Sequence, residues 1–226
     1  MFWFYDKTMV ILIPALIISA WAQLKVSSTF NKFSNVRSMN GYTGAQVARM
    51  LLDAEGLYDI PVQEISGRLT DHYDPRNRVM RLSTDVYNGT SVASIGVAAH
   101  ETGHAIQHKK HYAPLEIRNS IVPVVNFSSS ASWIIFMIGI FIKSSGLIQI
   151  GIMLFSAVVI FQLITLPVEF NASNRALKIL ESRNILYGDE IRGARSVLSA
   201  AAMTYVAAAL TAILELVRLI AISKDE

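Results

Sequence analysis

The chain has 226 residues, 52% of them hydrophobic, with a formal net charge of +3 and no cysteine. Soluble domains of this size seldom carry so much apolar sequence, so the composition favours a membrane protein. The positive charges are explained by membrane topology below, and we expect no nucleic-acid partner. Without cysteine there is no disulfide, thiolate metal site or cysteine nucleophile, so any metal must be held by histidine and carboxylate.

Four apolar stretches are each long enough to cross a bilayer, which takes about 20 helical residues. The first covers about Thr8–Leu24, and the other three lie at about 121–142, 146–168 and 197–222. Ala20-Trp21-Ala22 resembles a signal-peptide cleavage site, but the flank before the apolar run is short and carries no net charge. We therefore expect an uncleaved anchor and four transmembrane helices in all.

Two of these stretches contain polar residues that we interpret as structural. Glu215 and Arg218 lie three positions apart in the last stretch, so they can pair on one helix face. Serines at 128, 129, 130 and 132 make part of the second stretch polar. Small hydroxylated residues let transmembrane helices approach closely and hydrogen-bond, which favours packing over a substrate path.

Lysine and arginine are distributed unevenly around the four stretches. With four spans, the loops at about 25–120 and 169–196 share one side of the membrane, and most of the flanking basic residues lie in these two loops. The opposite side has Lys7, Lys143 and Lys224. Because cytoplasmic loops carry the excess of basic residues, both large loops are predicted to be cytoplasmic.

The first loop is long enough for a small domain, which begins with an amphipathic helix. YTGAQVARMLLDAEGL (42–57) has a capping box formed by Thr43 and Gln46, and Gly56 ends the helix.

A strand, a hairpin and a second helix are expected to follow. IPVQEI (60–65) favours a strand, and GRLTDHYDPRNRVMRLS (67–83) favours a hairpin that turns at its Asp-Pro-Arg-Asn segment. NGTSVASIGVAAHETGHAIQHKKH (88–111) begins with a turn and favours a helix capped by Thr90 or Ser91.

This second helix carries the residues that indicate chemistry. His100 and His104 lie one turn apart on one face, so both imidazoles can bind one metal ion. Glu101 lies beside them and can take a proton from a water there without being a ligand. Gly103 is expected to leave room beside the ion. This is the H-E-x-x-H arrangement of zinc hydrolases, on a predicted helix.

A catalytic zinc site usually needs a third protein ligand. His108 lies about 12 Å from His100 along an unbroken helix, which is too far for all three histidines to share one ion. The longer motif with a third histidine requires glycine and histidine where this chain has Gln107 and Lys110. We therefore interpret His108 and His111 as polar residues at the helix end.

The remaining candidates are later carboxylates: Glu116, Glu169, Glu181, Asp189, Glu190 and Glu215. Glu169 directly follows the third apolar stretch. A hairpin of the second and third spans returns the chain to the side that carries His100, which allows Glu169 to reach the metal. Glu215 is expected at the wrong depth. Spacing and topology alone leave the third ligand open.

Three segments together resemble the YugP-like family of bacterial membrane zinc metallopeptidases. They are LTDHYDPRNRVMRLSTDVYNG (69–89), GVAAHETGHAIQH (96–108) and LPVEFNASNRALKIL (166–180). The resemblance covers nearly the whole chain, including the first apolar stretch and TYVAAALTAIL (204–214). The family is similar in layout to membrane gluzincins, whose third ligand is a glutamate on a later helix. The resemblance implies one zinc ion bound by His100, His104 and Glu169, with Glu101 as the general base.

The chain departs from the family pattern at one position. That pattern is E-F-D-A-S, and Asn171 stands here in place of the aspartate. In related gluzincins an acidic residue after the ligand glutamate supports a zinc-bound histidine, so the change bears on metal affinity. Asn171 or Ser173 can accept that hydrogen bond instead.

Two further roles are open, and the resemblance bears on the first of them. Leu69–Asp74 is expected to be an edge strand that binds extended peptide by adding a strand, with His72 and Tyr73 either lining it or packing in the hairpin. The donor that stabilises the developing oxyanion stays open among Tyr205, Arg175 and Tyr112.

Together these inferences predict a mainly α membrane protein with about four transmembrane helices. A small α+β gluzincin-like domain is inserted between the first and second spans. The expected segments are an N-terminal anchor at 1–24, a zincin-like catalytic domain at 25–120, a transmembrane hairpin at 121–168, a cytoplasmic segment with the third ligand at 169–196 and a C-terminal transmembrane helix at 197–226.

The expected function is a zinc-dependent endopeptidase of the bacterial cytoplasmic (inner) membrane, with its site on the cytoplasmic side. Its substrates are expected to be membrane or membrane-proximal peptides and proteins. A hydrolase of a non-peptide amide or ester, or an inactive zinc-binding scaffold, would keep the same groups. A transporter would explain the spans but not the His-Glu motif. The sequence leaves open whether the chain forms oligomers or has an accessory membrane partner.

Overall fold

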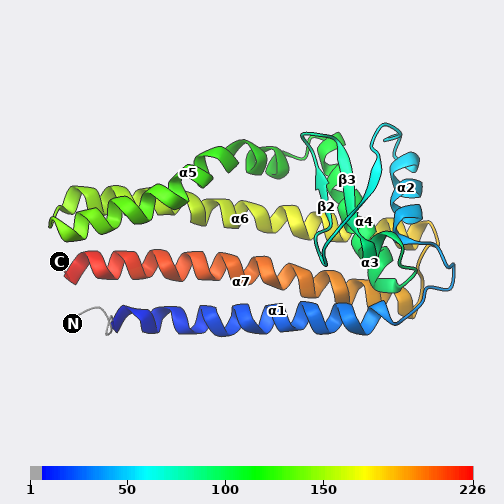
Figure 1. The fold of residues 1–226 in the computed structure, drawn as a ribbon, viewed down its shortest axis with the longest axis horizontal. Coiled ribbons are helices and arrows are strands. Elements are labelled where there is room, and N and C mark those ends of the chain that lie inside the picture. Colours follow the sequence, from blue (N-terminus) through cyan, green and yellow to red (C-terminus); the bar gives the residue numbers. More distant parts are fainter. Residues whose placement is uncertain (1–6, 226) are drawn as a thin grey trace. The chain divides into compact units, whose positions relative to one another are not determined.

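The computed structural model describes residues 7–225, so the first six residues of the expected 1–24 anchor and Glu226 lie outside the described part. A 3₁₀ segment (Lys7–Leu12) leads into α1 (Ile13–Ser34). The elements that follow are α2 (Gly44–Ala54), β1 (Val62–Ile65), β2 (His72–Asp74), β3 (Val79–Ser83), α3 (Thr84–Tyr87), α4 (Val92–Lys109), α5 (Ala113–Phe141), α6 (Ser145–Ser182) and α7 (Asp189–Asp225) (Figure 1). The predicted order of helix, strand, hairpin and helix is found in α2, β1, β2–β3 and α4, and the short α3 is an addition.

The chain divides into two compact units, each built from separate parts of the sequence. Among the described residues, the apolar unit comprises the chain up to Gln23, Glu116–Pro167 and the chain from Thr204 onwards. The site unit comprises Leu24–Leu115 and Val168–Met203. All four predicted site residues, namely His100, Glu101, His104 and Glu169, belong to the site unit.

Four helices within residues 7–225 are long and apolar enough to cross a membrane, as predicted. They cover Lys7–Ser34, Ala113–Phe141, Ser145–Ser182 and Asp189–Lys224. Each helix is longer than the apolar stretch that predicted it. In α6 the reason is visible, because Ala176, Leu177 and Leu180 of its less hydrophobic end are buried in the core of the site unit.

The polar residues of the apolar unit have structural contacts. Arg218 Nη1 lies 2.9 Å from Glu215 Oε1, and Arg218 Nε donates to Thr8 Oγ1 at 3.2 Å. The predicted ion pair is therefore confirmed. Ser128 and Ser132 are buried, which agrees with a role in helix packing.

Helix α2 begins with the predicted capping box. Gln46 N donates to Thr43 Oγ1 at 3.2 Å, and Thr43 N donates to Gln46 Oε1 at 2.9 Å. Gly56, just beyond the end of α2, has a φ of +69°, a conformation that glycine adopts without strain. Val47 and Leu51 lie on the buried face of α2, in the same hydrophobic core as residues of α4.

The three strands form one mixed sheet in the order β1-β3-β2. β2 and β3 make the predicted antiparallel hairpin, whose turn is closed when Asp74 Oδ1 accepts from the N–H groups of Arg76 and Asn77. β1 pairs with β3 in parallel, which the sequence did not predict. β2 is an edge strand, as the resemblance implied, although it covers only His72–Asp74 of the expected Leu69–Asp74. It lies beside α4, the helix that carries the H-E-x-x-H motif (Figure 1).

Candidate metal centre

Helix α4 holds both histidines on one rigid element. It begins at its N-cap residue Ser91, whose Oγ accepts from Ser94 N at 3.1 Å, so the predicted cap is confirmed at the second of the two positions. The helix then runs without interruption to Lys109. This continuity places His100 and His104 one turn apart, with Glu101 between them in sequence.

The two histidines and Glu169 bring three possible ligand atoms together. His100 Nε2 and His104 Nε2 are 3.2 Å apart, and Glu169 Oε2 lies 3.3 Å from the first and 3.5 Å from the second. A tetrahedral zinc ion with ligands about 2.0–2.1 Å away separates any two ligand atoms by roughly 3.3 Å. The three side chains therefore fit a zinc ion, and within residues 7–225 they form the only such group of three.

Glu169 reaches the histidines because α6 packs closely against α4. A Cβ added at Gly103 would lie only 2.7 Å from the backbone oxygen of Ala172, one turn beyond Glu169. The expectation that Gly103 leaves room beside the ion was therefore wrong, because this position is filled by the backbone of α6. Glu169 lies within α6, which continues through Pro167 to Ser182.

The other carboxylates considered from the sequence do not join this group. Glu116 and Glu215 belong to the apolar unit. Glu181 is exposed, Asp189 forms an ion pair with Arg192, and Glu190 Oε1 accepts from Met39 N at 2.7 Å. Within the described residues, Glu169 is the carboxylate that groups with both histidines.

Each histidine is also held through its second ring nitrogen. His100 Nδ1 lies 3.1 Å from Ser173 Oγ, one of the two supports considered from the sequence. His104 Nδ1 lies 3.0 Å from Gln107 Oε1, and Gln107 Nε2 donates to Asn171 Oδ1 at 3.1 Å. Sequence analysis missed Gln107, although its position three residues after His104 places it on the same helix face.

Glu101 is buried, with 8% of its surface exposed, and Glu101 Oε2 accepts from the backbone N–H of Tyr73 at 3.0 Å. Burial raises the pKa of Glu101 to about 7. His100 and the Tyr73 N–H act in the opposite direction, whereas negative charge on Glu169 and Asp71 raises this pKa further. A carboxyl group with such a pKa can both accept and donate a proton near neutral pH.

Tyr73 connects the edge strand β2 to α4 at two points. Its backbone N–H holds Glu101, and its hydroxyl lies 2.9 Å from His108 Nδ1. Its side chain packs in the core, so ordinary hairpin packing is one of its roles. His108 is part of the last turn of α4, and His111 follows with a φ of +48°, so their interpretation as helix-end residues is confirmed.

The donor for an oxyanion stays a prediction. Arg175 Nε donates to Asn171 Oδ1 at 2.6 Å, so this group is engaged within α6. Tyr205 belongs to the apolar unit, and Tyr112 lies in the turn between α4 and α5.

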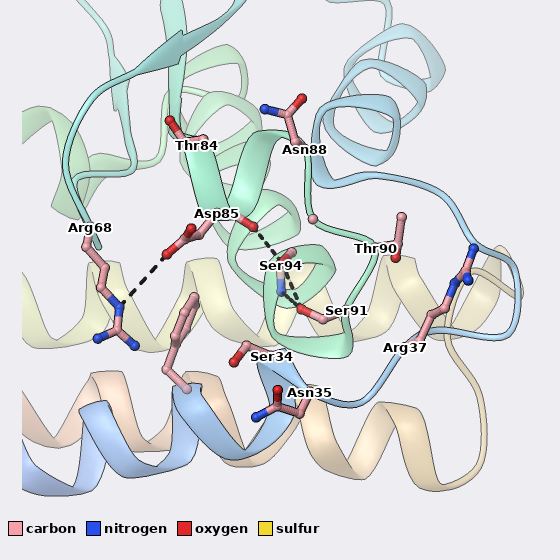
Figure 2. Close-up of a pocket in the computed structure, with 12 residues that line it drawn as sticks. Ser34, Asn35, Arg37, Arg68, Thr84, Asp85, Asn88, Thr90, Ser91 and Ser94 are labelled. Atoms are coloured by element: carbon pink, nitrogen blue, oxygen red, sulfur yellow. Dashed lines mark hydrogen bonds and ion pairs between the residues drawn. The ribbon is translucent and has the colours of Figure 1, made fainter.

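A separate cavity of about 630 Å³ lies at the beginning of α4 (Figure 2). None of the four predicted site residues lines it. Figure 2 shows Arg68 and Asp85 facing each other on its wall, with Arg68 Nε 3.9 Å from Asp85 Oδ2. Ser94 Oγ donates to the backbone oxygen of Asp85 at 3.0 Å. These wall groups pair with one another, and the cavity is distinct from the metal centre.

Comparison with known proteins identifies the class. The family model described as "Putative neutral zinc metallopeptidase" matches residues 8–224, so the chain belongs to this family. It is also 54% identical over 210 residues to "Putative membrane protease YugP" of Bacillus subtilis (strain 168), and the match covers 93% of each chain. These two findings confirm the resemblance seen in the sequence. No solved structure gives a significant match.

Removal of the Glu169 carboxylate should abolish tight zinc binding, because two imidazoles on one helix leave the site short of its third ligand. Metal analysis of the purified protein should find one zinc per chain in the wild type and in Glu181→Ala, and almost none in Glu169→Ala. Glu181 is a matched control because it is an exposed glutamate of the same helix. Full zinc occupancy in Glu169→Ala would exclude Glu169 as a ligand.

Gly103→Ala should weaken zinc binding by roughly 10- to 100-fold, the range seen when groups behind the ligands are disturbed. The added methyl group would displace the α6 backbone at Ala172 and with it Glu169. Gly146→Ala is the control, because nothing lies within 4 Å of a Cβ at that position of α6. Equal zinc affinities of the two variants, measured by competition with a chelator, would contradict a role for this contact.

Proposed function

We propose that this member of the metallopeptidase family is an active zinc-dependent endopeptidase that uses Glu101 as its general base. The observation that carries the proposal is the triangle of His100, His104 and Glu169 ligand atoms with a buried carboxylate on the same helix. Two histidines and a glutamate are a known ligand set of catalytic zinc. Membership of the metallopeptidase family supports the same function.

The residues of the chain have separable roles in this mechanism. When bound, zinc would lower the pKa of a water towards about 7 and polarise the scissile carbonyl. Glu101 accepts the proton of the attacking water and then donates it to the leaving amine. The Tyr73 N–H fixes the direction of the Glu101 carboxylate by its hydrogen bond. His100, His104 and Glu169 would hold the ion beside this carboxylate, since two of them lie on the same helix as Glu101.

The edge strand supports a peptide as the substrate. β2 pairs only with β3 among the described strands, so an extended peptide can add along its outer side, using groups other than the Tyr73 N–H, which Glu101 already holds. Tyr73 of this strand also holds Glu101, which brings the binding edge next to the general base. Four helices able to cross a membrane accompany the site, so we infer that the substrates are membrane or membrane-proximal proteins.

We infer that the protein is a multi-pass protein of the bacterial cytoplasmic membrane with its metal centre on the cytoplasmic side. The match to a protein named as a membrane protease in Bacillus subtilis supports the membrane location. The excess of lysine and arginine in the two loops that hold His100 and the residues after Glu169 supports the cytoplasmic side.

Glu101→Gln should keep zinc but lose at least about 99% of peptidase activity, because general acid–base catalysis typically contributes 10²- to 10⁴-fold. Casein and a peptide library are suitable substrates for the purified protein, with Glu64→Gln on β1 as a control for the loss of a negative charge. Cleavage by Glu101→Gln at the wild-type rate would exclude the proposed base. Zinc binding without peptide cleavage by the wild type would favour a non-peptide hydrolase or an inactive scaffold.

Cysteine labelling can test the orientation, because the natural chain contains no cysteine. Ser145→Cys lies at the start of α6, and Glu181→Cys lies near its other end. A membrane-impermeant maleimide should label Ser145→Cys in intact protoplasts and Glu181→Cys only after lysis. The reverse pattern would place the loop after α6 outside the cell and contradict the proposed location.

A further inference from the structure

We propose that Gln107 is a positioning residue that fixes the tautomer of His104 and so prepares its Nε2 to bind the metal. The inference rests on the proposed function, in which His104 is a zinc ligand. In this proposal the fold determines which nitrogen of the neutral His104 ring carries the proton before any ion binds.

Gln107 lies entirely within the protein, with 0% of its surface exposed. Its amide is fully used in hydrogen bonds. Oε1 lies 3.0 Å from His104 Nδ1, while Nε2 donates to the backbone oxygen of Val168 at 2.8 Å and to Asn171 Oδ1 at 3.1 Å. One amide on α4 therefore contacts a histidine on its own helix and two groups on α6.

The orientation of this amide follows from partners that can act in only one way. A backbone carbonyl can only accept, so the NH₂ of Gln107 must face Val168. A guanidinium can only donate, so Arg175 Nε fixes Asn171 Oδ1 as an acceptor, which the second N–H of Gln107 uses. Two independent contacts thus turn Oε1 of Gln107 towards His104.

The tautomer of His104 is the consequence. Gln107 Oε1 can only accept, so Nδ1 of His104 must carry the proton. In the neutral ring the lone pair then lies on Nε2, the atom that faces His100 and Glu169. Because the proton already lies on Nδ1, no free energy is spent on moving it away from Nε2 when the metal binds.

His100 is held differently. Its Nδ1 lies 3.1 Å from Ser173 Oγ, and a hydroxyl can either donate or accept. This contact orients the ring without dictating where its proton lies. The two histidines therefore differ. Gln107, oriented by α6, fixes the tautomer of His104, whereas the contact with Ser173 leaves the tautomer of His100 undetermined.

The same amide also couples two ligands. Val168, which accepts from Gln107, directly precedes Glu169 in α6. Gln107 therefore links the ring of His104 to the backbone of the helix turn that presents Glu169. Loss of this amide should affect the metal through both ligands at once.

The tautomer can be measured directly in the metal-free wild type. Nitrogen-15 NMR of histidine-labelled protein at a pH where the rings are neutral should show His104 as the Nδ1–H tautomer. His104→Ala would assign the signal. An Nε2–H tautomer at His104 would overturn the proposal. Because this measurement needs neither zinc nor a substrate, it stands even if the peptidase activity is not found.

Two variants of Gln107 separate positioning from packing. Gln107→Met removes the acceptor and should weaken zinc binding by roughly 10- to 100-fold, with loss of the single tautomer. Gln107→Glu keeps an acceptor for Nδ1–H, so it should retain the tautomer and bind zinc more tightly than Gln107→Met. Thr102→Val is the matched control, since Thr102 is a fully buried polar residue of α4 that bonds to the Ala98 oxygen.

Chelator competition gives the zinc affinities, and melting temperatures report stability separately. A purely structural role predicts lower melting temperatures in Gln107→Met and Thr102→Val alike, with unchanged zinc affinity and tautomer. That result would overturn the proposal. The proposal is supported if zinc affinity is lower in Gln107→Met than in the wild type, is unchanged in Thr102→Val, and lies between these values in Gln107→Glu.

Discussion

The metal centre depends on the close approach of α6 to α4 at Gly103. Because Gly103 has no side chain, the backbone oxygen of Ala172 in α6 can lie only 2.7 Å from the position that a Cβ would take. Glu169 lies three residues before Ala172 and Ser173 directly after it in the same helix, so one packing contact delivers a ligand and a support for His100. Zinc tolerates little variation in ligand distance, and the fit of the three ligand atoms follows from this contact.

Polar groups around the centre are costly to bury, and several of them have hydrogen-bond partners. The second nitrogens of both histidines have partners, and Glu101 accepts from a backbone N–H. Asn171 accepts from Gln107 and Arg175, so its part in supporting His104 is indirect. An asparagine oxygen can accept from both donors. It does so without adding a negative charge to a buried site that already holds two carboxylates.

The features that could be predicted from the sequence are those set by neighbours along the chain. The spacing of His100 and His104, the capping box of Thr43 and Gln46 and the hairpin before α4 all follow from local periodicity and turn chemistry. The apolar stretches predicted the four helices for the same reason.

The features that escaped prediction depend on contacts between distant segments. Gln107 bonds to residues 61 and 64 positions away, so nothing near it in sequence marks it as a support. Gly103 has its role only because α6 crosses there, and the parallel pairing of β1 with β3 likewise depends on the whole domain. Spacing left the third ligand open among six carboxylates, and the fold groups one of them with the histidines.

Zinc K-edge X-ray absorption of the metal-loaded protein reports the ligands of the ion itself. A site of His100, His104 and Glu169 should give a first shell of nitrogen and oxygen at about 2.0–2.1 Å, with the scattering of two imidazoles and no sulfur. A spectrum that requires three imidazoles, or only one, would contradict the ligand set on which the mechanism rests.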